Sequence, residues 1–494
     1  MFTFPHTLDR AKTLFPDAGI SDGENHQTYR QTASNAACVA TELDQRGVSE
    51  GDVVAVAAWN TPEFFELLYA VTGIGAVIYP VNVNLPSEQI GYTIDRADTD
   101  LLVYGPDFAK IAGSYPGDTV PISELQGAEE ETELSADPDD PAVILFTSGT
   151  TGMPKAVRYT HEKMVQGALA MAHQMAEYST PASLSAEDAV FPGIPMYHLL
   201  SWGTTIFAPY LGADLVLAGR FDPDRLGGAV ESGEATWSCL VPTMAVQLLE
   251  TEHDIEGLTL LTGGSVVKRG LTDRLRDAGV SFATIYGGTD MLAVGITLWT
   301  EHAREAGYEY VRRATHPVPY VDVEVDESEG QNGMGELLVR TPWLPDGYHG
   351  SPDDADGAYV DGWFHTGDLA RRHPDGGITI VDRLTDTIKS GGEWIPSGVL
   401  ESAISETDGV ESVAVLAKPD EEWGERPLAA VKGDASEDAI RADLDAKSET
   451  GRIESWWIPD DIRFLDEMPL TSTGKIQKRS LRDQLLDTAQ SEDK

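Results

Sequence analysis

A short loop rich in hydroxyls and glycines is the part of this sequence whose residue types best suit chemistry. Hydroxyls donate hydrogen bonds to phosphate oxygens, glycines let the backbone approach a ligand closely, and a lysine adds positive charge. All three residue types occur within the nine residues 147–155. The pattern predicts a phosphate-binding loop, whose candidate binding residues are Thr147, Ser148, Gly149, Thr150, Thr151, Gly152 and Lys155.

Two apolar runs flank this loop and predict the strands that position it. Residues 142–146 are continuously apolar, which is typical of a buried strand, and residues 156–159 suit a second one. The common P-loop ends in Gly-Lys-Ser/Thr and begins a helix, whereas here Pro154 separates the last glycine from the lysine. A polar hairpin turn would explain the glycines and threonines but not the added Pro154 and Lys155.

The loop resembles the signature loop of the superfamily of AMP-forming acyl-CoA synthetases, luciferases and peptide-synthetase adenylation domains. Five further segments resemble that superfamily in the same order, and residues 60–63 and 67–83 look like its amino-terminal region. The five segments are residues 286–290 (YGGTD), 362–368 (GWFHTGD), 382–386 (DRLTD), 391–393 (GGE) and 473–475 (TGK). The resemblance covers nearly the whole chain and is closest to the fatty-acyl-CoA ligases.

The resemblance implies an α/β protein with two domains. A large layered amino-terminal domain, residues 1–384, would combine α/β sheets with a β-barrel-like part and bind ATP and the acid. A small mobile α+β domain, residues 385–494, would carry the catalytic lysine and the CoA-tunnel loop. The sequence agrees, because residues 1–384 alternate apolar strand-like runs with amphipathic helices. The small domain is predicted to contain strands at 412–416, 427–431 and 462–465 and a helix at 435–447.

The resemblance also implies an ATP site with Mg²⁺. The phosphate loop would hold the β- and γ-phosphates, Thr289 would lie at the α-phosphate, and Asp290 would hold Mg²⁺ directly or through water. The family usually has Glu at this position, and Asp is one methylene shorter. The adenine would lie along Gly263, Gly264, Ser265, Tyr286 and Gly287, and the ribose would be bound by Asp368 and Arg383, with turn capping as the alternative role of Asp368.

Lys475 is the candidate catalytic residue for the adenylation step. The resemblance places its ammonium between the carboxylate of the acid and the α-phosphate, where it would stabilise charge in the transition state. A solvated surface lysine is the alternative. The clustering of Lys475 with Lys478, Arg479 and Arg482 in a chain poor in basic residues favours the catalytic role.

A second set of residues in the small domain resembles the CoA-binding loop of the family. The loop 390–395 would line the passage for the pantetheine arm of CoA, because its small residues Gly391 and Gly392 admit the arm, and Lys389 beside it is a further candidate for binding the cofactor. In relatives the small domain rotates between the two steps about a residue that is usually Asp or Lys. Here that residue is Thr385, and Asp386 beside it stays an alternative hinge.

The segment that contains His198 and Trp202 resembles the acyl-binding segment of fatty-acyl-CoA synthetases. His198 would lie near the adenylate, Trp202 would guard an acyl tunnel, and Gly287 and Gly288 would border the acid. Both large side chains could instead be ordinary core residues. Met164, Ala168, Met171 and Met175 recur at helical spacing and are predicted to form a core-facing stripe rather than a chemical site.

The leading hypothesis is an ATP-dependent ligase that joins a medium- or long-chain fatty acid to CoA through an acyl-AMP. The alternatives are a ligase for aryl or other short acids, an adenylating enzyme that transfers to a carrier protein, and a nucleotide-binding regulator without turnover. The regulator would be expected to lose Lys475 or Asp368, and both are present.

The charge of the chain is extreme, with 82 acidic against 35 basic residues and a formal net charge of −47. Such a surface repels itself in dilute buffer, but molar salt shortens the Debye length to about 3 Å and the carboxylates then keep the protein hydrated. The composition therefore predicts a high-salt cytosol. It argues against nucleic-acid binding and against binding to anionic membranes.

Residues 1–20 include Pro5, Asp9, Arg10 and Lys12 rather than a signal-peptide core, and no apolar run is long enough to span a bilayer. We therefore expect a cytoplasmic protein without stable membrane insertion. The only two cysteines, Cys38 and Cys239, are expected to be buried and inert. The sequence does not fix the oligomeric state and leaves a homodimer open.

Overall fold

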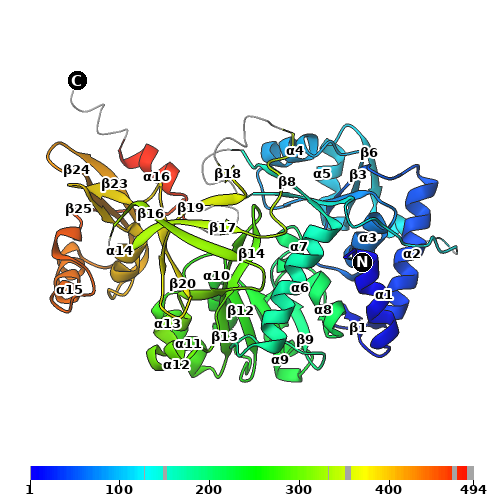
Figure 1. Ribbon diagram of the computed structural model, residues 1–494, viewed down its shortest axis with the longest axis horizontal. Coiled ribbons are helices and arrows are strands. Elements are labelled where there is room, and N and C mark those ends of the chain that lie inside the picture. The colour runs from blue at the N-terminus through cyan, green and yellow to red at the C-terminus, as the bar shows by residue number, and fades with distance from the viewer. Residues whose placement is uncertain are drawn as a thin grey trace. The chain divides into compact units, whose positions relative to one another are not determined.

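The computed structural model describes residues 2–126, 128, 130–147, 153–331, 333–350, 358–469 and 476–486 (Figure 1). The chain forms two compact units. Unit 1 comprises Met1–Gly149, Met153–Asp322 and Arg340–Phe364, and unit 2 comprises Thr150–Gly152, Val323–Val339 and His365–Lys494. Unit 2 therefore includes residues before 385. The predicted boundary of the mobile domain, between residues 384 and 385, stays a prediction, because it describes which part of the chain moves and not which residues pack together.

The first sheet of unit 1 has six strands, in the order β6-β5-β3-β4-β7-β8. All neighbours are parallel except the β7–β8 hairpin. Its central strands β3 and β4 are fully buried apolar runs, as expected for a sheet covered on both faces. The strands are β3 (Val53–Ala57), β4 (Val77–Pro80), β5 (Leu101–Tyr104), β6 (Asp118–Pro121), β7 (Pro141–Phe146) and β8 (Ala156–Thr160).

Of the five helices before and between these strands, the first three begin at a threonine whose side chain caps the helix. Thr28 forms a capping box with Gln31 at the start of α2, and the Thr61 hydroxyl accepts a hydrogen bond from the Phe64 amide at the start of α3, where Pro62 fills the first helical position. The helices are α1 (Phe4–Leu14), α2 (Tyr29–Gln45), α3 (Pro62–Gly73), α4 (Ser87–Arg96) and α5 (Ala109–Ser114).

The second sheet of unit 1 runs in the order β15-β14-β13-β12-β11-β9-β10-β1-β2. Its central strands, from β13 to β1, are parallel, and β14, β15 and β2 are antiparallel to their neighbours. The strands are β1 (Gly19–Ser21), β2 (His26–Thr28), β9 (Ala189–Pro192), β10 (Asp214–Val216), β11 (Trp237–Leu240), β12 (Thr259–Gly263), β13 (Ser281–Gly288), β14 (Leu292–Ile296) and β15 (Ala314–Pro317).

Helices α6 to α13 accompany this second sheet (Figure 1). They are α6 (His161–Glu177), α7 (Leu199–Trp202), α8 (Thr204–Leu211), α9 (Pro223–Ser232), α10 (Pro242–Leu249), α11 (Arg269–Asp277), α12 (Glu301–Ala306) and α13 (Tyr308–Val311). Within the described residues, no helix combines the length and the apolar character that crossing a bilayer requires.

Unit 2 is built mainly from two groups of paired strands. In the first, β16, β17, β19 and β20 lie side by side, and in the second the order is β22-β21-β24-β23 with β25 parallel to β24. Their bounds are β16 (Asp322–Gln331), β17 (Met334–Arg340), β19 (Trp363–Arg372), β20 (Ile378–Arg383), β21 (Ile388–Ser390), β22 (Glu393–Ile395), β23 (Val410–Asp420), β24 (Gly424–Gly433) and β25 (Asp461–Phe464). The short β18 (Tyr359–Val360) pairs with the start of β19.

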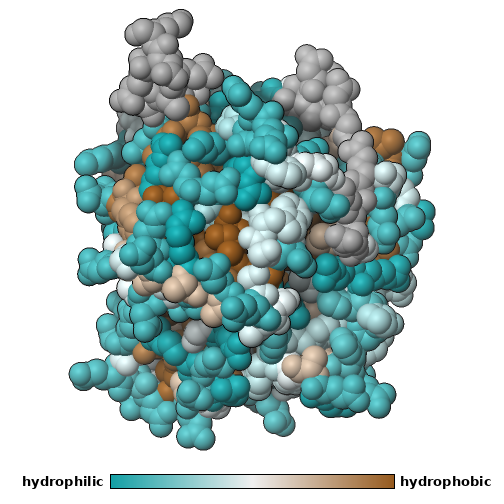
Figure 2. Space-filling model, turned by 90° about the vertical axis from the view of Figure 1, so that its left-hand side faces the viewer, coloured by the Kyte–Doolittle hydropathy of each residue, from teal (hydrophilic) through white to brown (hydrophobic). Residues whose placement is uncertain are grey.

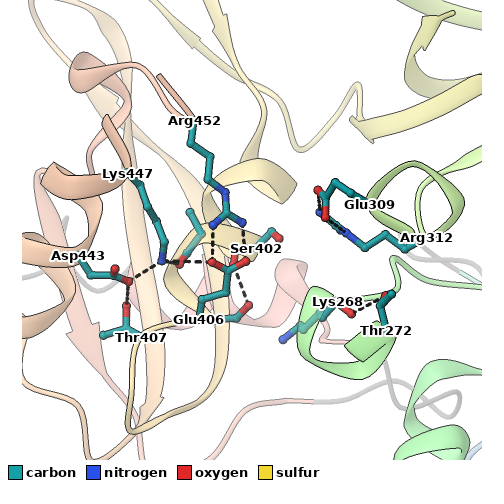
Figure 3. Close-up of polar contacts among 12 residues, drawn as sticks. Lys268, Thr272, Glu309, Arg312, Ser402, Glu406, Thr407, Asp443, Lys447 and Arg452 are labelled. Carbon is teal, nitrogen blue, oxygen red and sulfur yellow. Dashed lines mark hydrogen bonds and ion pairs between the residues drawn. The ribbon is translucent and has the colours of Figure 1, made fainter. Parts of the chain in front are cut away.

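Three helices complete unit 2, namely α14 (Ser397–Ile404), α15 (Glu437–Glu449) and α16 (Lys478–Leu485). Ion pairs link α15 to the segment after α14, because Glu406 pairs with both Arg452 and Lys447, and Lys447 also donates to the Ala403 carbonyl over 2.6 Å (Figure 3). The predicted α/β fold with a large and a small part is confirmed.

Two local expectations need correction. Cys239 is buried as expected, but Cys38 is only half-buried. The helical stripe on α6 has a further role, described below.

Candidate functional site

The hairpin of β7 and β8 holds the two ends of the predicted phosphate loop together. The Thr147 amide donates to the Lys155 carbonyl over 2.9 Å, and the Lys155 amide lies 3.2 Å from the Thr147 hydroxyl oxygen. The Lys155 ammonium lies 4.5 Å from the centre of the Tyr348 ring, a cation–π distance. Residues Ser148, Gly149, Thr150, Thr151 and Gly152 lie outside the described residues.

The turn between β13 and β14 carries Thr289 and Asp290, the predicted α-phosphate and metal residues. Gly288 ends β13, and a Cβ atom at Gly287 would lie only 2.3 Å from the Leu292 carbonyl oxygen. Only glycine therefore allows the two strands to approach this closely. The turn is tight, and its geometry depends on the glycine pair that precedes it.

Aromatic side chains bind three successive carbonyls of this turn. The Tyr159 hydroxyl donates to the Thr289 carbonyl over 2.7 Å, the Tyr359 hydroxyl to that of Asp290 over 2.9 Å, and the Trp343 Nε1 to that of Met291 over 3.2 Å. Burial raises the pKa of Tyr159 well above its usual value, so its hydroxyl keeps its proton and stays a donor. We call Tyr159, Trp343 and Tyr359 the aromatic clamp.

Sequence reasoning missed the aromatic clamp, because its donors lie far from the turn along the chain. Tyr159 stands on β8 and is 130 positions from Thr289. Its only sequence signal is an aromatic residue in a predicted buried strand, which indicates packing and nothing more. The clamp links the strand after the phosphate loop to the turn that carries Asp290.

The two segments predicted to line the adenine lie side by side. Gly263 at the end of β12 is in register with Ile285 on the parallel β13, one residue before the half-buried Tyr286. A Cβ atom at Gly263 would lie 2.5 Å from the Ile285 carbonyl oxygen, and Gly264 has φ of +78°. The exposed Ser265 follows them. The structure thus places Gly263 beside the strand that leads directly into Tyr286 and Gly287.

The loop after this segment is anchored by a buried arginine. Arg312 is 7% exposed, donates to the Val267 carbonyl over 3.2 Å and pairs with Glu309 (Figure 3). Lys268 is the N-cap of α11, and in the first turn of this helix the Thr272 hydroxyl donates to the Lys268 carbonyl over 3.3 Å (Figure 3). The anchor fixes the path of the chain directly after Ser265.

An apolar cavity adjoins the adenine segments. It contains about 540 Å³ of empty space, part of it open to solvent, and none of its lining residues is charged. Its walls come from α6, from the segment 199–203 and from the ends of β12, β13 and β14. The lining residues are Met164, Gly167, Ala168, Met171, Leu199, Trp202, Gly203, Gly264, Ile285, Gly287, Leu292 and Ala293.

The cavity corrects the interpretation of the α6 stripe as core alone, and it shows where the predicted acyl-binding residues Trp202 and His198 lie. The stripe on α6 is buried as predicted, but Met164, Ala168 and Met171 line the cavity in addition to packing in the core. Trp202 is in the cavity wall. His198 is half-buried beside Tyr197, with ring centres 4.8 Å apart, and is not among the lining residues.

Asp368 and Arg383, the predicted ribose partners, face each other within unit 2. They are directly paired across the antiparallel strands β19 and β20, and the Arg383 Nε lies 2.9 Å from the Asp368 Oδ1. Arg383 also donates to the Thr366 carbonyl over 3.0 Å. The Asp368 side chain is 7% exposed, so the carboxylate is held in a fixed position.

The predicted CoA loop is the tight hairpin between β21 and β22. Gly391 and Gly392 have φ of +61° and +85°, which glycine adopts without cost. The Gly391 amide donates to the Trp423 carbonyl over 2.7 Å, and a Cβ atom at Gly391 would lie 2.7 Å from the Trp423 ring. Lys389, on β21, has its ammonium 5.8 Å from the centre of the Trp394 ring.

Lys475 lies outside the described residues, but its neighbours in the basic cluster are described. The ammonium of Lys478 lies 2.8 Å from the Glu401 carboxylate and donates to the Ser397 hydroxyl over 2.7 Å. Arg482 pairs with Asp386, the alternative hinge residue. Two of the four cluster residues therefore anchor α16 within unit 2.

A magnesium ion fits the donor set of the β13–β14 turn. Among the residues that the structure describes, no group of three or more His, Cys, Asp or Glu side chains could enclose a metal ion. Mg²⁺ in nucleotide sites is usually held by one or two carboxylates together with phosphate oxygens and water. Asp290, on its clamped turn, would supply such a carboxylate.

The sequence and the fold match known proteins along most of the chain. Residues 8–349 match the family model of AMP-binding enzymes, and residues 399–475 match that of the AMP-binding enzyme C-terminal domain. The chain is 31% identical to the long-chain-fatty-acid–CoA ligase of Thermus thermophilus, over 97% of this chain and 94% of the relative. It is 30% identical to a feruloyl-CoA synthase of Amycolatopsis, over 96% and 97%.

One similar solved structure is the o-succinylbenzoate coenzyme A synthetase of Bacillus subtilis in complex with ATP and a magnesium ion. The TM-score is 0.84 at 23% identity, over 97% of this chain and 99% of the other. This similarity supports the fold.

Proposed function

Because the chain belongs to the AMP-binding enzyme family, we propose that it is an ATP-dependent acid:CoA ligase that works through an acyl-AMP. In the first step, a carboxylate oxygen attacks the α-phosphorus of ATP and pyrophosphate leaves. In the second, the CoA thiol loses its proton and attacks the acyl carbonyl, and AMP leaves with the bonding electrons. The products are an acyl-CoA thioester, AMP and pyrophosphate.

The first step brings two anions together, so the site must supply positive charge and alignment. Lys155 and the hydroxyls of the phosphate loop would hold the departing pyrophosphate, and Lys475 would neutralise the reacting carboxylate and α-phosphate. Mg²⁺, when bound, would supply further charge neutralisation on the phosphates. The aromatic clamp would keep Thr289 and Asp290 in place, so that little reorganisation is needed when ATP binds.

The single observation that carries this proposal is the uncharged cavity that meets the adenine segments at Gly264 and Gly287. An acid whose carboxylate reacts beside the adenylate would place its tail in this cavity. Gly287 and Gly288 would border the reacting end, and His198 would lie near the adenylate outside the cavity wall. The sites for CoA would be Lys389, Gly391 and Gly392 in unit 2.

The substrate that we propose is a fatty acid of medium or long chain. Its support is the apolar lining by methionines, leucines and glycines, together with the long-chain ligase among the relatives. An aryl acid is the second candidate, because a feruloyl-CoA synthase is almost equally similar. Transfer to a carrier protein instead of CoA is the third.

A pyrophosphate-release screen over straight-chain and aryl acids, each with and without CoA, tests this proposal. We expect release to depend on the acid, turnover to require CoA, and the highest kcat/KM to fall on a straight-chain acid. A preference for ferulate would mean that the substrate is an aryl acid and not a fatty acid. Absence of pyrophosphate with every acid would contradict the ligase assignment.

We further propose that the enzyme works in a high-salt cytosol. The support is the net charge of −47 and the surface in Figure 2, where hydrophilic side chains cover most of the face shown and hydrophobic patches lie between them. Carboxylates at this density repel one another unless salt screens them.

A further inference from the structure

The segment 199–203 has an unusual backbone. It lines the apolar cavity that we propose for the acyl tail, which we call the acyl cavity. Leu199, Leu200, Ser201 and Trp202 have φ of 52°, 52°, 56° and 54°, and Gly203 follows with φ of 82°. The Trp202 amide donates to the His198 carbonyl over 3.1 Å, and the Gly203 amide to that of Leu199 over 2.8 Å. These residues form a left-handed helical turn, although L-residues other than glycine visit this region almost only singly.

The left-handed turn supplies part of the cavity wall. Leu199, Trp202 and Gly203 line the cavity, whereas Leu200 and Ser201 are fully buried. Because the hand of a helical turn determines where its successive side chains point, a relaxed turn would move Leu199 and Trp202. A disfavoured conformation that sets a ligand-binding wall must be held by its surroundings.

Asn60 holds the segment that leads into this turn. Its Nδ2 donates to the Ile194 carbonyl over 2.9 Å and to the Pro192 carbonyl over 3.2 Å, and its Oδ1 accepts from the Met196 amide over 2.7 Å. One side chain therefore ties three backbone groups between β9 and the turn.

The same network reaches the turn itself. The Ser201 hydroxyl donates to the Ile194 carbonyl over 2.8 Å, and its oxygen lies 3.4 Å from the Asn60 Nδ2. Asn60 is 5% exposed, and its own carbonyl accepts a hydrogen bond from the Gly219 amide over 2.8 Å. Asn60 is thus fixed by its own backbone and immediately precedes the N-cap of α3.

We propose that Asn60 is a positioning residue of the acyl cavity, which selects among acids by holding the left-handed turn; this inference rests on the proposed ligase function. Asn60 does not touch the cavity, since it is not among the lining residues. It acts through Ser201 and the 192–196 backbone, which place Leu199 and Trp202 opposite Met164 and Met171 of α6.

Asn60→Asp tests the proposal, because it keeps the shape of the side chain and removes the amide donor. A carboxyl oxygen would then face the Pro192 and Ile194 carbonyls. We expect the ratio of kcat/KM between hexanoate and palmitate to change by about tenfold or more, the scale of discrimination by hydrophobic pockets. We expect the KM for ATP to stay close to the wild-type value. An unchanged acid ratio would overturn the proposal.

Gln174→Glu is the matched control. Gln174 is also buried, and its Nε2 donates to two backbone carbonyls, those of Ile296 over 3.0 Å and His316 over 3.1 Å. The control variant should be less stable to heat with an unchanged acid ratio. If both variants changed the ratio alike, Asn60 would have only a general structural role.

A milder variant keeps the test decisive if Asn60→Asp fails to fold. Ser201→Ala removes only the hydroxyl between Asn60 and Ile194, and we expect the acid ratio to shift in the same direction. Binding of the acids without ATP, measured by calorimetry, should show the same change in length preference. Wild-type protein that releases no pyrophosphate would refute the ligase function. If the wild type is active and the variants have the same acid ratio as the wild type, only the role of Asn60 is refuted.

Discussion

At the scale of single residues, we expect the chemistry to depend on side chains that hold backbone carbonyls as much as on those that would touch ATP. The aromatic clamp illustrates this, because Tyr159, Trp343 and Tyr359 satisfy the three carbonyls of the turn that carries Thr289 and Asp290. A buried carbonyl that loses its donor costs about 1–3 kcal/mol. The turn would be expected to shift rather than leave that carbonyl unpaired.

Tyr159→Phe removes one donor of the clamp and nothing else. We expect kcat for acid-dependent pyrophosphate release to fall about tenfold, since a tenfold change needs only about 1.4 kcal/mol of lost transition-state stabilisation. Thermal stability should fall as well. Steady-state kinetics and a melt on the same sample measure both effects.

Tyr29→Phe is the control for this prediction. Tyr29 is also fully buried and donates to a backbone carbonyl, that of Ala213, over 2.6 Å. This variant should lose similar stability and keep its activity. Equal loss of activity in the two variants would show that the clamp has no specific role.

At the scale of elements, α1 is joined to α6 through a buried histidine. The Phe4 amide lies 3.3 Å from the Nδ1 of His161, and their rings lie 5.4 Å apart. Burial lowers the pKa of His161 to about 4. The folded protein therefore keeps this imidazole neutral, whereas the unfolded chain binds a proton below about pH 6.5.

This difference in protonation makes stability depend on pH. The contribution of His161 is complete above about pH 6.5 and is lost as the pH falls towards 4, because the unfolded chain then binds the extra proton. At about pH 5 the loss amounts to about 2 kcal/mol. We expect denaturant unfolding of His161→Gln to lack this part of the pH dependence. Parallel pH profiles for the variant and the wild type would contradict the assignment.

The β21–β22 hairpin provides a second test at this scale. Gly392 has φ of +85° and open space beside its Cα, so Gly392→Leu would strain the backbone and place a side chain where the pantetheine arm is expected. We expect thioester formation to fall strongly while acid-dependent ATP–pyrophosphate exchange stays near normal. Loss of both half-reactions would contradict the assignment of this hairpin to the passage for the pantetheine arm.

Gly376→Leu separates strain from obstruction. Gly376 also has φ of +85° with open space, and it lies in the turn between β19 and β20 of the same unit. It should lose comparable stability and leave both half-reactions intact. A selective loss of thioester formation in this control would mean that strain alone explains the Gly392 variant.

The sequence predicted those elements whose signal is local. Residues 142–146 and 156–159 form β7 and β8, and the helix expected at 435–447 is α15 at Glu437–Glu449, because an apolar run or a 3.6-residue period is visible in one short window. The pairing of Asp368 with Arg383 followed from the family resemblance. The cavity role of Met164 and Met171 did not follow, because a core stripe and a cavity wall have the same periodicity.

The long-range contacts could not be predicted from local patterns. The three contacts of the aromatic clamp join positions 52, 69 and 130 apart, and Asn60 reaches segments more than 130 positions away. The residue types from Leu199 to Trp202 do not predict a left-handed turn, since they avoid positive φ. Such features come from tertiary packing, which overrides local preference at the site.

At the scale of the whole molecule, the proposal of a high-salt cytosol rests on the net charge of −47. We expect the melting midpoint and activity to rise as KCl goes from tenths of a molar to several molar, through screening of carboxylates and stronger burial of apolar surface. NaCl serves as the comparison salt. A midpoint that is flat or falls across the series would remove the high-salt inference and leave the ligase assignment intact.

The fate of the α-phosphate of ATP tests the central claim most directly. ATP labelled at the α-phosphate is mixed with the preferred fatty acid and excess enzyme without CoA, and CoA is then added. We predict a labelled acyl-AMP bound to the enzyme in the first stage, and its conversion to labelled AMP with equimolar acyl-CoA in the second. Formation of labelled ADP, or of AMP without any need for the acid, would contradict the account.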